Sequence, residues 1–127
     1  MKIASLDIGL KRVGVSICLM NDVVTPLPAI IRKNRNQAAK DVNSFLEEWE
    51  IEKLIIGLPS SNIDTQNRIK HFTNLLNLKI PFEFQEENLS SIEAKELMKG
   101  EVKHIRDGRI DSIAAKIILE RYLRKKL

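Results

Sequence analysis

Residues 1–14 read MKIASLDIGLKRVG, an apolar stretch of strand type that carries a single carboxylate, Asp7. The apolar run breaks at Gly9, crosses the cationic pair Lys11 and Arg12, and then resumes. An ionised carboxylate inside a strand costs free energy unless another group pairs with it. Asp7 is therefore either a satisfied structural acid or a group that the strand directs toward a metal ion or a phosphate.

The length and composition of the chain limit the fold classes that it can form. The chain has 127 residues, of which 43% are hydrophobic and 30% charged, and its formal net charge is +4. This length supports one domain with its own core but not two substantial lobes, so residues 1–127 are expected to form a single domain. The basic balance is compatible with a polyanionic partner, although alone it supports one only weakly.

The sequence also bears on location. Asp7 and the Lys11–Arg12 pair interrupt any apolar core of a signal peptide. No apolar stretch approaches the ~20 residues that a membrane span needs. We expect a cytoplasmic protein with no membrane partner. The single cysteine, Cys18, cannot form an internal disulfide and is interpreted as a small buried hydrophobe.

Hydrophobic patterning predicts three strands at the start of the chain. Residues 2–9, 13–20 and 23–32 read as strands joined by short turns, which together make an antiparallel meander. Pro26 and Pro28 cannot donate hydrogen bonds to a neighbouring strand. The third strand is therefore expected at an edge of the sheet.

From about residue 36 the pattern changes to helices that alternate with strands. A first helix is predicted from apolar residues spaced four, three and four apart. These residues are Ala38, Val42, Phe45 and Trp49. KLIIGLPS (53–60) is a continuous apolar run, typical of a strand covered on both faces. PFEFQEE (81–87) predicts a fifth strand, which ends in acids.

Capping residues mark the remaining helices. Asp64 or Thr65 is expected to cap a second helix, and Ser90 and Glu93 have the spacing of a capping box. The last helix is predicted to begin near Arg109. The expected fold is an α/β layer with a mixed five-stranded sheet, an antiparallel meander plus two parallel strands, flanked by helices.

Three parts of the chain carry acids where a plain fold favours other residues. Asp7 lies inside the first strand, Glu86 and Glu87 end the fifth, and Asp111 lies on the apolar stripe of the last helix. If the first, fourth and fifth strands are parallel neighbours, a helix across the sheet brings these acids together. Carboxylates that close require a counter-charge. Mg²⁺ fits this need, and a pair of such ions clamps a phosphodiester during hydrolysis.

Each acid also has a plain structural explanation. Asp111 in the first turn of a helix interacts favourably with the helix dipole. Glu86 and Glu87 are equally explained as solvated acids at a strand end. Asp7 is the hardest to explain in this way, because an acid in the middle of a strand needs a partner. The residues alone leave the metal site and the structural interpretation open.

Five stretches stand in a fixed order along nearly the whole chain. They are DIGLKRVGVS (7–16), PLPAI (26–30), IIGLP (55–59), QEENLSSIEA (85–94) and RIDSIAAKIIL (109–119). They resemble motifs of the YqgF-type family, described as Holliday-junction resolvases and as nucleases that mature the 5′ end of pre-16S rRNA. The first matches D-x-G-x-x-R-I-G-V-A, the fourth H-D-E-R-L-S/T-T-x-E-A and the fifth x-V-D-S-x-A-A-x-x-I-L.

The resemblance implies an RNase H-like fold and a phosphodiester hydrolysis that depends on Mg²⁺ or Mn²⁺. Asp7, Glu87 and Asp111 would be the catalytic residues and the metal ligands. Glu87 occupies the position of the motif's Glu, which leaves Glu86 as a supporting acid. Asn88 stands where the family has an arginine, a residue whose bidentate contacts Asn cannot reproduce.

The resemblance also implies where nucleic acid binds. Arg12 matches an arginine in the family's first loop, where it would meet a phosphate with Lys11 beside it. A second basic segment precedes the last helix. The nucleic-acid-binding residues expected from both segments are Lys11, Arg12, Lys103, Arg106 and Arg109. The family's N-M-D-G-T loop after G-L-P is reduced here to SSNIDT (60–65).

The leading hypothesis is a metal-dependent endonuclease that processes the 5′ end of pre-16S rRNA, in a monomer or weak dimer that acts on ribosomal precursor particles. A Holliday-junction resolvase for branched DNA is the alternative within the same class, and it requires a dimer. A catalytically silent nucleic-acid-binding module is the alternative that Asn88 suggests. A sugar-kinase-like or actin-like ATPase would need a second lobe, which 127 residues cannot supply.

Overall fold

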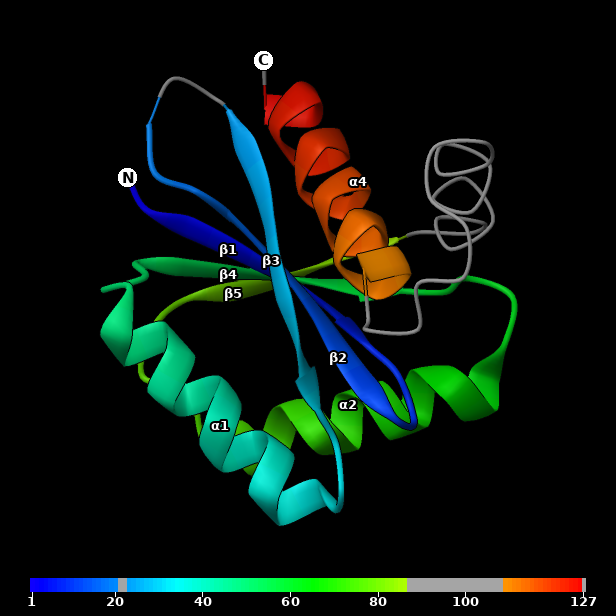
Figure 1. The fold of residues 1–127 in the computed structure, drawn as a ribbon. Helices are drawn as coiled ribbons and strands as arrows, with labels where there is room; N and C mark the ends of the chain where they lie inside the picture. The colour runs from blue at the N-terminus through cyan, green and yellow to red at the C-terminus, as the bar shows by residue number, and fades with distance from the viewer. Residues whose placement is uncertain (21–22, 87–108, 127) are drawn as a thin grey trace.

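The computed structural model describes residues 1–20, 23–86 and 109–126 and shows a mixed sheet with helices on both faces (Figure 1). The strands are β1 (Ile3–Ile8), β2 (Arg12–Cys18), β3 (Val24–Ile31), β4 (Lys53–Leu58) and β5 (Phe82–Glu86). The described helices are α1 (Arg35–Glu48), α2 (Ile63–Leu76) and α4 (Arg109–Lys126). The helix predicted from Ser90 and Glu93 lies outside the described residues.

The sheet has five strands in the order β3-β2-β1-β4-β5. β1 and β2 pair antiparallel, as do β2 and β3, whereas β4 runs parallel to both β1 and β5. This arrangement confirms the predicted meander and the two parallel strands. Pro26 and Pro28 lie in β3, at the edge of the sheet, as their missing N–H groups require.

Side chains alternate between the two faces of the sheet. α1 and α2 cover one face and α4 lies across the other (Figure 1). The core under α1 and α2 takes Leu6 from β1, Val15 from β2 and Ile56 from β4. The core under α4 includes Ile55 and the buried Cys18. β4 is therefore buried on both faces, as its unbroken apolar sequence predicts.

The structure confirms the predicted first helix and contradicts one predicted cap. The buried residues of α1 are Ala38, Ala39, Val42 and Leu46. Phe45 and Trp49 are half-buried and pack against the same core from the margin of the apolar face. α2 is capped by Asn62, not by Asp64 or Thr65. The Asn62 side chain accepts a hydrogen bond from the Thr65 N–H, and Asn caps helices as well as Asp does.

A polar triad ties the second half of α4 to the sheet. Lys53 Nζ donates a hydrogen bond to the Tyr122 hydroxyl at 2.6 Å and forms an ion pair with Glu83. The Tyr122 hydroxyl in turn donates to Glu83 Oε2 at 3.0 Å. Hydrogen bonds to Glu83 and then Tyr122 raise the pKa of Lys53 above its ordinary 10.5. β4, β5 and α4 are thus linked by one charged group.

Replacing Lys53 with Met is expected to lower the free energy of unfolding at pH 8 by about 1 kcal/mol, the upper range for a partly exposed ion pair. The folded state holds the Lys53 proton more tightly than the unfolded state does. The stabilisation of the folded state by Lys53 is therefore complete below pH 10.5, and it declines as the pH rises through the raised pKa of Lys53. Urea titrations of wild type, Lys53→Met and the exposed control Lys125→Met check this. A difference between wild type and Lys53→Met that stays constant to pH 12 contradicts it.

Candidate functional site

Asp7 lies at the edge of the sheet where the three parallel strands end. Leu6 pairs with Ile56 and Ile56 with Phe84, so β1, β4 and β5 reach this edge together. Ser5, two residues before Asp7, is hydrogen-bonded to α4. Alternation along the strand therefore directs Asp7 to the same face as α4, where it is half-buried.

Gly14 brings Asp7 and Asp111 together. It is the cross-strand partner of Asp7, and such partners have Cα atoms about 5 Å apart. A Cβ atom at Gly14 would lie 2.0 Å from the Asp111 carbonyl oxygen and 2.8 Å from the Ser112 nitrogen. The first turn of α4 thus rests directly on the backbone of Gly14. Two acids 104 positions apart in sequence flank one glycine.

Buried serines fix α4 to the β1–β2 hairpin beside these acids. Ser5 Oγ donates to the Ala115 carbonyl oxygen at 2.6 Å, and Ser16 Oγ donates to the same oxygen at 3.1 Å. The two hydroxyl oxygens lie 2.5 Å apart. Ser112 Oγ accepts a hydrogen bond from the Val15 N–H at 3.4 Å. Because buried polar groups are costly when unpaired, this network holds the helix in one position on the sheet.

Arg12 completes the charged group. It starts β2, and alternation through Gly14 and Ser16 places it on the face of α4. Arg12 Nη1 lies 3.8 Å from Asp111 Oδ2, and the two side chains are 31% and 30% exposed. The arginine predicted to meet a phosphate thus forms an ion pair with one of the predicted metal ligands.

The other predicted site residues have different positions. Glu86 ends β5 and is exposed, and it pairs in register with Leu58. Its neighbour Gln85 is level with Gly57, which faces α4, so Glu86 points to the opposite face from Asp7. Lys11 is exposed in the β1–β2 turn. Arg109 begins α4. Glu87, Lys103 and Arg106 lie outside the described residues.

The carboxylates of Asp7 and Asp111 are oxygen ligands of the kind that a hard divalent cation prefers. Mg²⁺ is usually held by one or two carboxylates, several waters and the phosphates of a substrate. Asp7 and Asp111 flank Gly14 on the same face of the sheet, and both side chains are partly open to solvent. Within the ranges 1–20, 23–86 and 109–126, no group of three histidine, cysteine or acidic side chains forms a metal site. Two acids fit a site that shares its ion with a substrate.

Gly14 and the serines of the network shape the candidate site, but the sequence-based predictions do not single them out. Their signal is an alternation of small and large residues. From residue 5 onward, Ser5 and Asp7 in β1 and Gly14, Ser16 and Cys18 in β2 share one face, and the aliphatic residues between them share the other. Small residues on one face of a hairpin indicate a helix packed unusually close to it.

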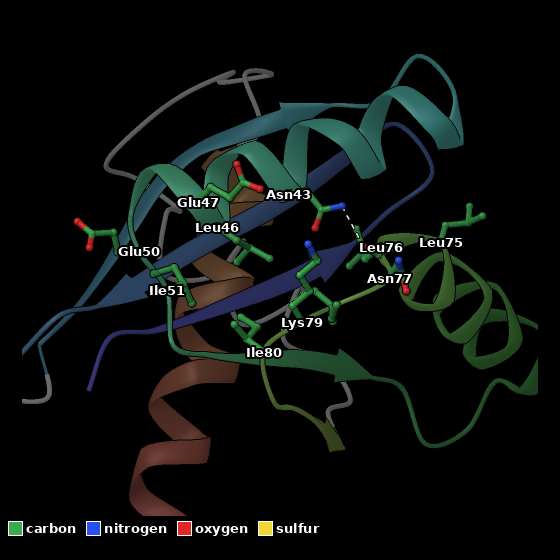
Figure 2. A pocket seen from close by; sticks show the side chains of 11 residues that line it. Asn43, Leu46, Glu47, Glu50, Ile51, Leu75, Leu76, Asn77, Lys79 and Ile80 are labelled. Carbon is green, nitrogen blue, oxygen red and sulfur yellow. Dashed lines mark hydrogen bonds between the residues drawn. The ribbon is translucent and has the colours of Figure 1, made fainter.

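A hollow on the described surface is remote from the acids. It has a volume of about 550 Å³ and lies between the C-terminal ends of α1 and α2 (Figure 2). Asn43 Nδ2 donates to the Leu76 carbonyl oxygen across it at 3.0 Å. Ile51 and Ile80, which precede β4 and β5, also line it. It therefore opens at the edge where these strands begin, opposite the edge of Asp7.

A search of the described helices finds none that is both long and apolar enough to cross a membrane.

Comparisons with solved structures agree on the fold. The chain superposes on T. thermophilus RuvC in complex with a Holliday junction substrate with a TM-score of 0.61 at 10% identity, covering 99% of this chain and 96% of that one. The fowlpox virus Holliday junction resolvase matches over the full length of both chains, with a TM-score of 0.56 at 15% identity. At these identities the likeness establishes the RNase H-like fold alone.

Sequence comparisons identify the family. A protein of Sulfurovum sp. named "Putative pre-16S rRNA nuclease" is 60% identical over 126 residues, which span 97% of this chain and 98% of that protein. A protein of the same name from Sulfurimonas denitrificans is 50% identical over 129 residues, or 99% of each chain. Residues 1–125 match the family described as RuvX: Holliday junction resolvase. The YqgF-type resemblance is therefore confirmed, and the chain belongs to the RuvX family.

Proposed function

We propose that this chain is a divalent-metal-dependent endonuclease that processes the 5′ end of pre-16S rRNA. Its family and its named relatives are hydrolases of phosphodiester bonds. The choice of pre-16S rRNA rests on the names of relatives that are 50–60% identical over nearly the whole chain. The proposal includes a cytoplasmic location and ribosomal precursor particles as partners.

The observation that carries the proposal is the meeting of Asp7 and Asp111 at Gly14. Burial and repulsion both disfavour two carboxylates at one point, so a fold that places them there needs a cation. Arg12 supplies one positive charge to Asp111, at the edge of the same site. A purely structural acid in β1 would not require a second acid on α4.

Asp7 and Asp111 would hold the ion, with Glu87 as the third ligand that the family motif implies. When bound, the ion supplies a Lewis acid for a phosphoryl oxygen and lowers the pKa of a bound water. The serine network keeps α4 fixed, so Asp111 needs no reorganisation when substrate arrives. Arg12 and the exposed Lys11 offer donors for the phosphate at the mouth of the site.

A Holliday-junction resolvase is the second candidate, because the family description and the RuvC likeness both name that substrate for related proteins. It requires two copies with sites facing opposed strands. Sedimentation and cleavage of a four-way DNA junction beside the RNA separate the two candidates.

The direct test is cleavage of a pre-16S rRNA 5′-leader substrate by the purified protein with Mg²⁺, with Mn²⁺ and with EDTA. The proposal predicts a discrete product with either metal and none with EDTA. Salt-dependent binding without any product would instead support the silent binding module. Cleavage in EDTA at the rate seen with metal would exclude the metal mechanism.

Arg12→Gln is expected to affect metal and RNA in opposite directions. Removing a cation 3.8 Å from Asp111 takes away repulsion of the incoming ion. Mn²⁺ affinity should therefore rise about threefold to tenfold at low salt, allowing for solvent screening. RNA affinity should fall because a phosphate donor is lost. Mn²⁺ titration by electron paramagnetic resonance and RNA binding by fluorescence anisotropy check the two effects. Weaker Mn²⁺ binding in the variant contradicts a metal site at Asp111.

A further inference from the structure

Three arginines gather beside the β1–β2 turn, on the side of the sheet away from α4. Arg32 follows β3, Arg35 begins α1 and Arg68 lies in α2. β3 runs parallel to β1, because each pairs antiparallel with β2, so both strands end at the same edge of the sheet. α2 begins at that edge too, because it follows β4, which is parallel to β1. The turn lies beside α2 (Figure 1). These cations are therefore neighbours of the edge that carries Asp7.

A small hollow separates the turn from α2. Its volume is about 160 Å³, and its apolar lining includes Ile8 at the end of β1 and Leu10 in the turn. Its polar lining consists of Arg32, Thr65 and Arg68. Two guanidinium groups and a hydroxyl thus border one space of a size that suits a small anion.

Contacts within the protein hold the two guanidinium groups in place. Arg32 Nη1 donates to the Gly9 carbonyl oxygen at 2.9 Å, and its guanidinium carbon lies 5.1 Å from the centre of the Phe72 ring. Arg68 Nη2 donates to Thr65 Oγ1 at 3.0 Å. Donors that are already oriented lose less entropy when a ligand binds.

The positive charge of this group is uncompensated in the part of the chain that the structure describes. Neither Arg32, Arg35 nor Arg68 forms an ion pair there with a carboxylate. Burial, and then repulsion by Arg35 and Arg68, lower the pKa of Arg32. Arg35 Nη1 lies 3.1 Å from His71 Nε2, so Arg35 is directed to that ring. Arg32 and Arg68 are left to face the hollow.

We propose that the hollow binds one backbone phosphate of the substrate strand through Arg32 and Arg68. Planar guanidinium groups match phosphate oxygens in geometry and charge, and the Thr65 hydroxyl adds a polar contact. Ile8 follows Asp7 directly, so a strand with one phosphate at the acids reaches the hollow by crossing the β1–β2 turn. This inference rests on the proposed nuclease function and extends its substrate contact to the α2 side of the sheet.

The test compares Arg68→Gln with Lys70→Gln. Both residues are exposed cations of α2, but positions two apart face different sides of a helix. Binding of a single-stranded 5′-leader RNA is measured by fluorescence anisotropy in EDTA, from 50 to 200 mM salt. Arg68→Gln should weaken binding about tenfold at 50 mM salt and reduce the slope of log K against log salt by about 0.7. Lys70→Gln should change the affinity less than about twofold.

The outcomes separate this inference from the proposed function. Equal effects of Arg68→Gln and Lys70→Gln, or no binding by the wild type, would overturn the phosphate site. Cleavage by the wild type with Mg²⁺ is measured on the same RNA. If the protein cleaves RNA but binds it independently of Arg68, the result supports the nuclease function and contradicts the phosphate site. If it binds RNA through Arg68 but never cleaves it, the result supports the phosphate site and contradicts the nuclease function.

Discussion

Gly14→Ala is expected to lower the free energy of unfolding by about 3 kcal/mol and to abolish cleavage, because overpacking against backbone is among the costliest core changes. The new Cβ would lie 2.0 Å from the Asp111 carbonyl oxygen, and backbone at the start of α4 cannot give way as a side chain can. The helix must move off the sheet. That movement breaks the Ser112 hydrogen bond and separates Asp111 from Asp7.

Gly57→Ala provides the matched control for this prediction. Its Cβ would meet Ile118 Cδ1 at 2.4 Å, the far end of a side chain that can change rotamer. A loss of about 1 kcal/mol is expected, with cleavage retained. Chemical denaturation and cleavage rates of both variants check the pair. A Gly14→Ala protein with the stability and cleavage rate of the wild type would show that α4 does not rest on Gly14.

Asp7→Asn is expected to reduce metal-dependent cleavage about a thousandfold, since loss of a ligand removes several kcal/mol of transition-state stabilisation. The amide preserves size and one oxygen but removes the charge that holds a divalent ion. Repulsion between Asp7 and Asp111 also disappears, so folding stability should stay within about 1 kcal/mol of the wild type. Cleavage rates, Mn²⁺ titration and urea denaturation give the three readouts.

This variant also separates the two explanations of Asp7 that its sequence position allows. A structural acid predicts a substantial loss of stability with unchanged cleavage by the folded fraction. A metal ligand predicts the reverse. Glu48→Gln, which neutralises an exposed acid of α1, serves as the control and should leave both readouts unchanged. A destabilised Asp7→Asn protein that still cleaves at the wild-type rate would remove Asp7 from the chemistry.

Much of the fold follows from local physics. The paired prolines Pro26 and Pro28 predict an edge strand, and the unbroken apolar sequence of β4 predicts a strand covered twice, and both predictions are confirmed. The sequence predicts the cap of α2 at Asp64 or Thr65 instead of Asn62, because Asn, Asp and Thr are all favoured at the N-cap of a helix. Local signals thus predict the elements better than their ends.

The candidate site was less predictable because its contacts are distant in sequence. Asp7 is conspicuous alone, as an acid inside an apolar strand. Its closeness to Asp111 depends on how closely α4 packs on the sheet. That close packing is possible because Gly14 has no side chain. The hollow between Arg32 and Arg68 depends likewise on where α2 begins. Neither arginine stands out in the sequence, because single cations are common both on helices and after strands.

The measurement that tests the metal site most directly is anomalous diffraction from crystals of the wild-type protein soaked in Mn²⁺. The same preparation should first be shown to cleave the 5′-leader RNA with Mn²⁺. We predict an anomalous peak within coordination distance of both Asp7 and Asp111, which disappears in Asp7→Asn crystals. An active preparation whose crystals show no Mn²⁺ at these carboxylates would contradict a metal site formed by Asp7 and Asp111.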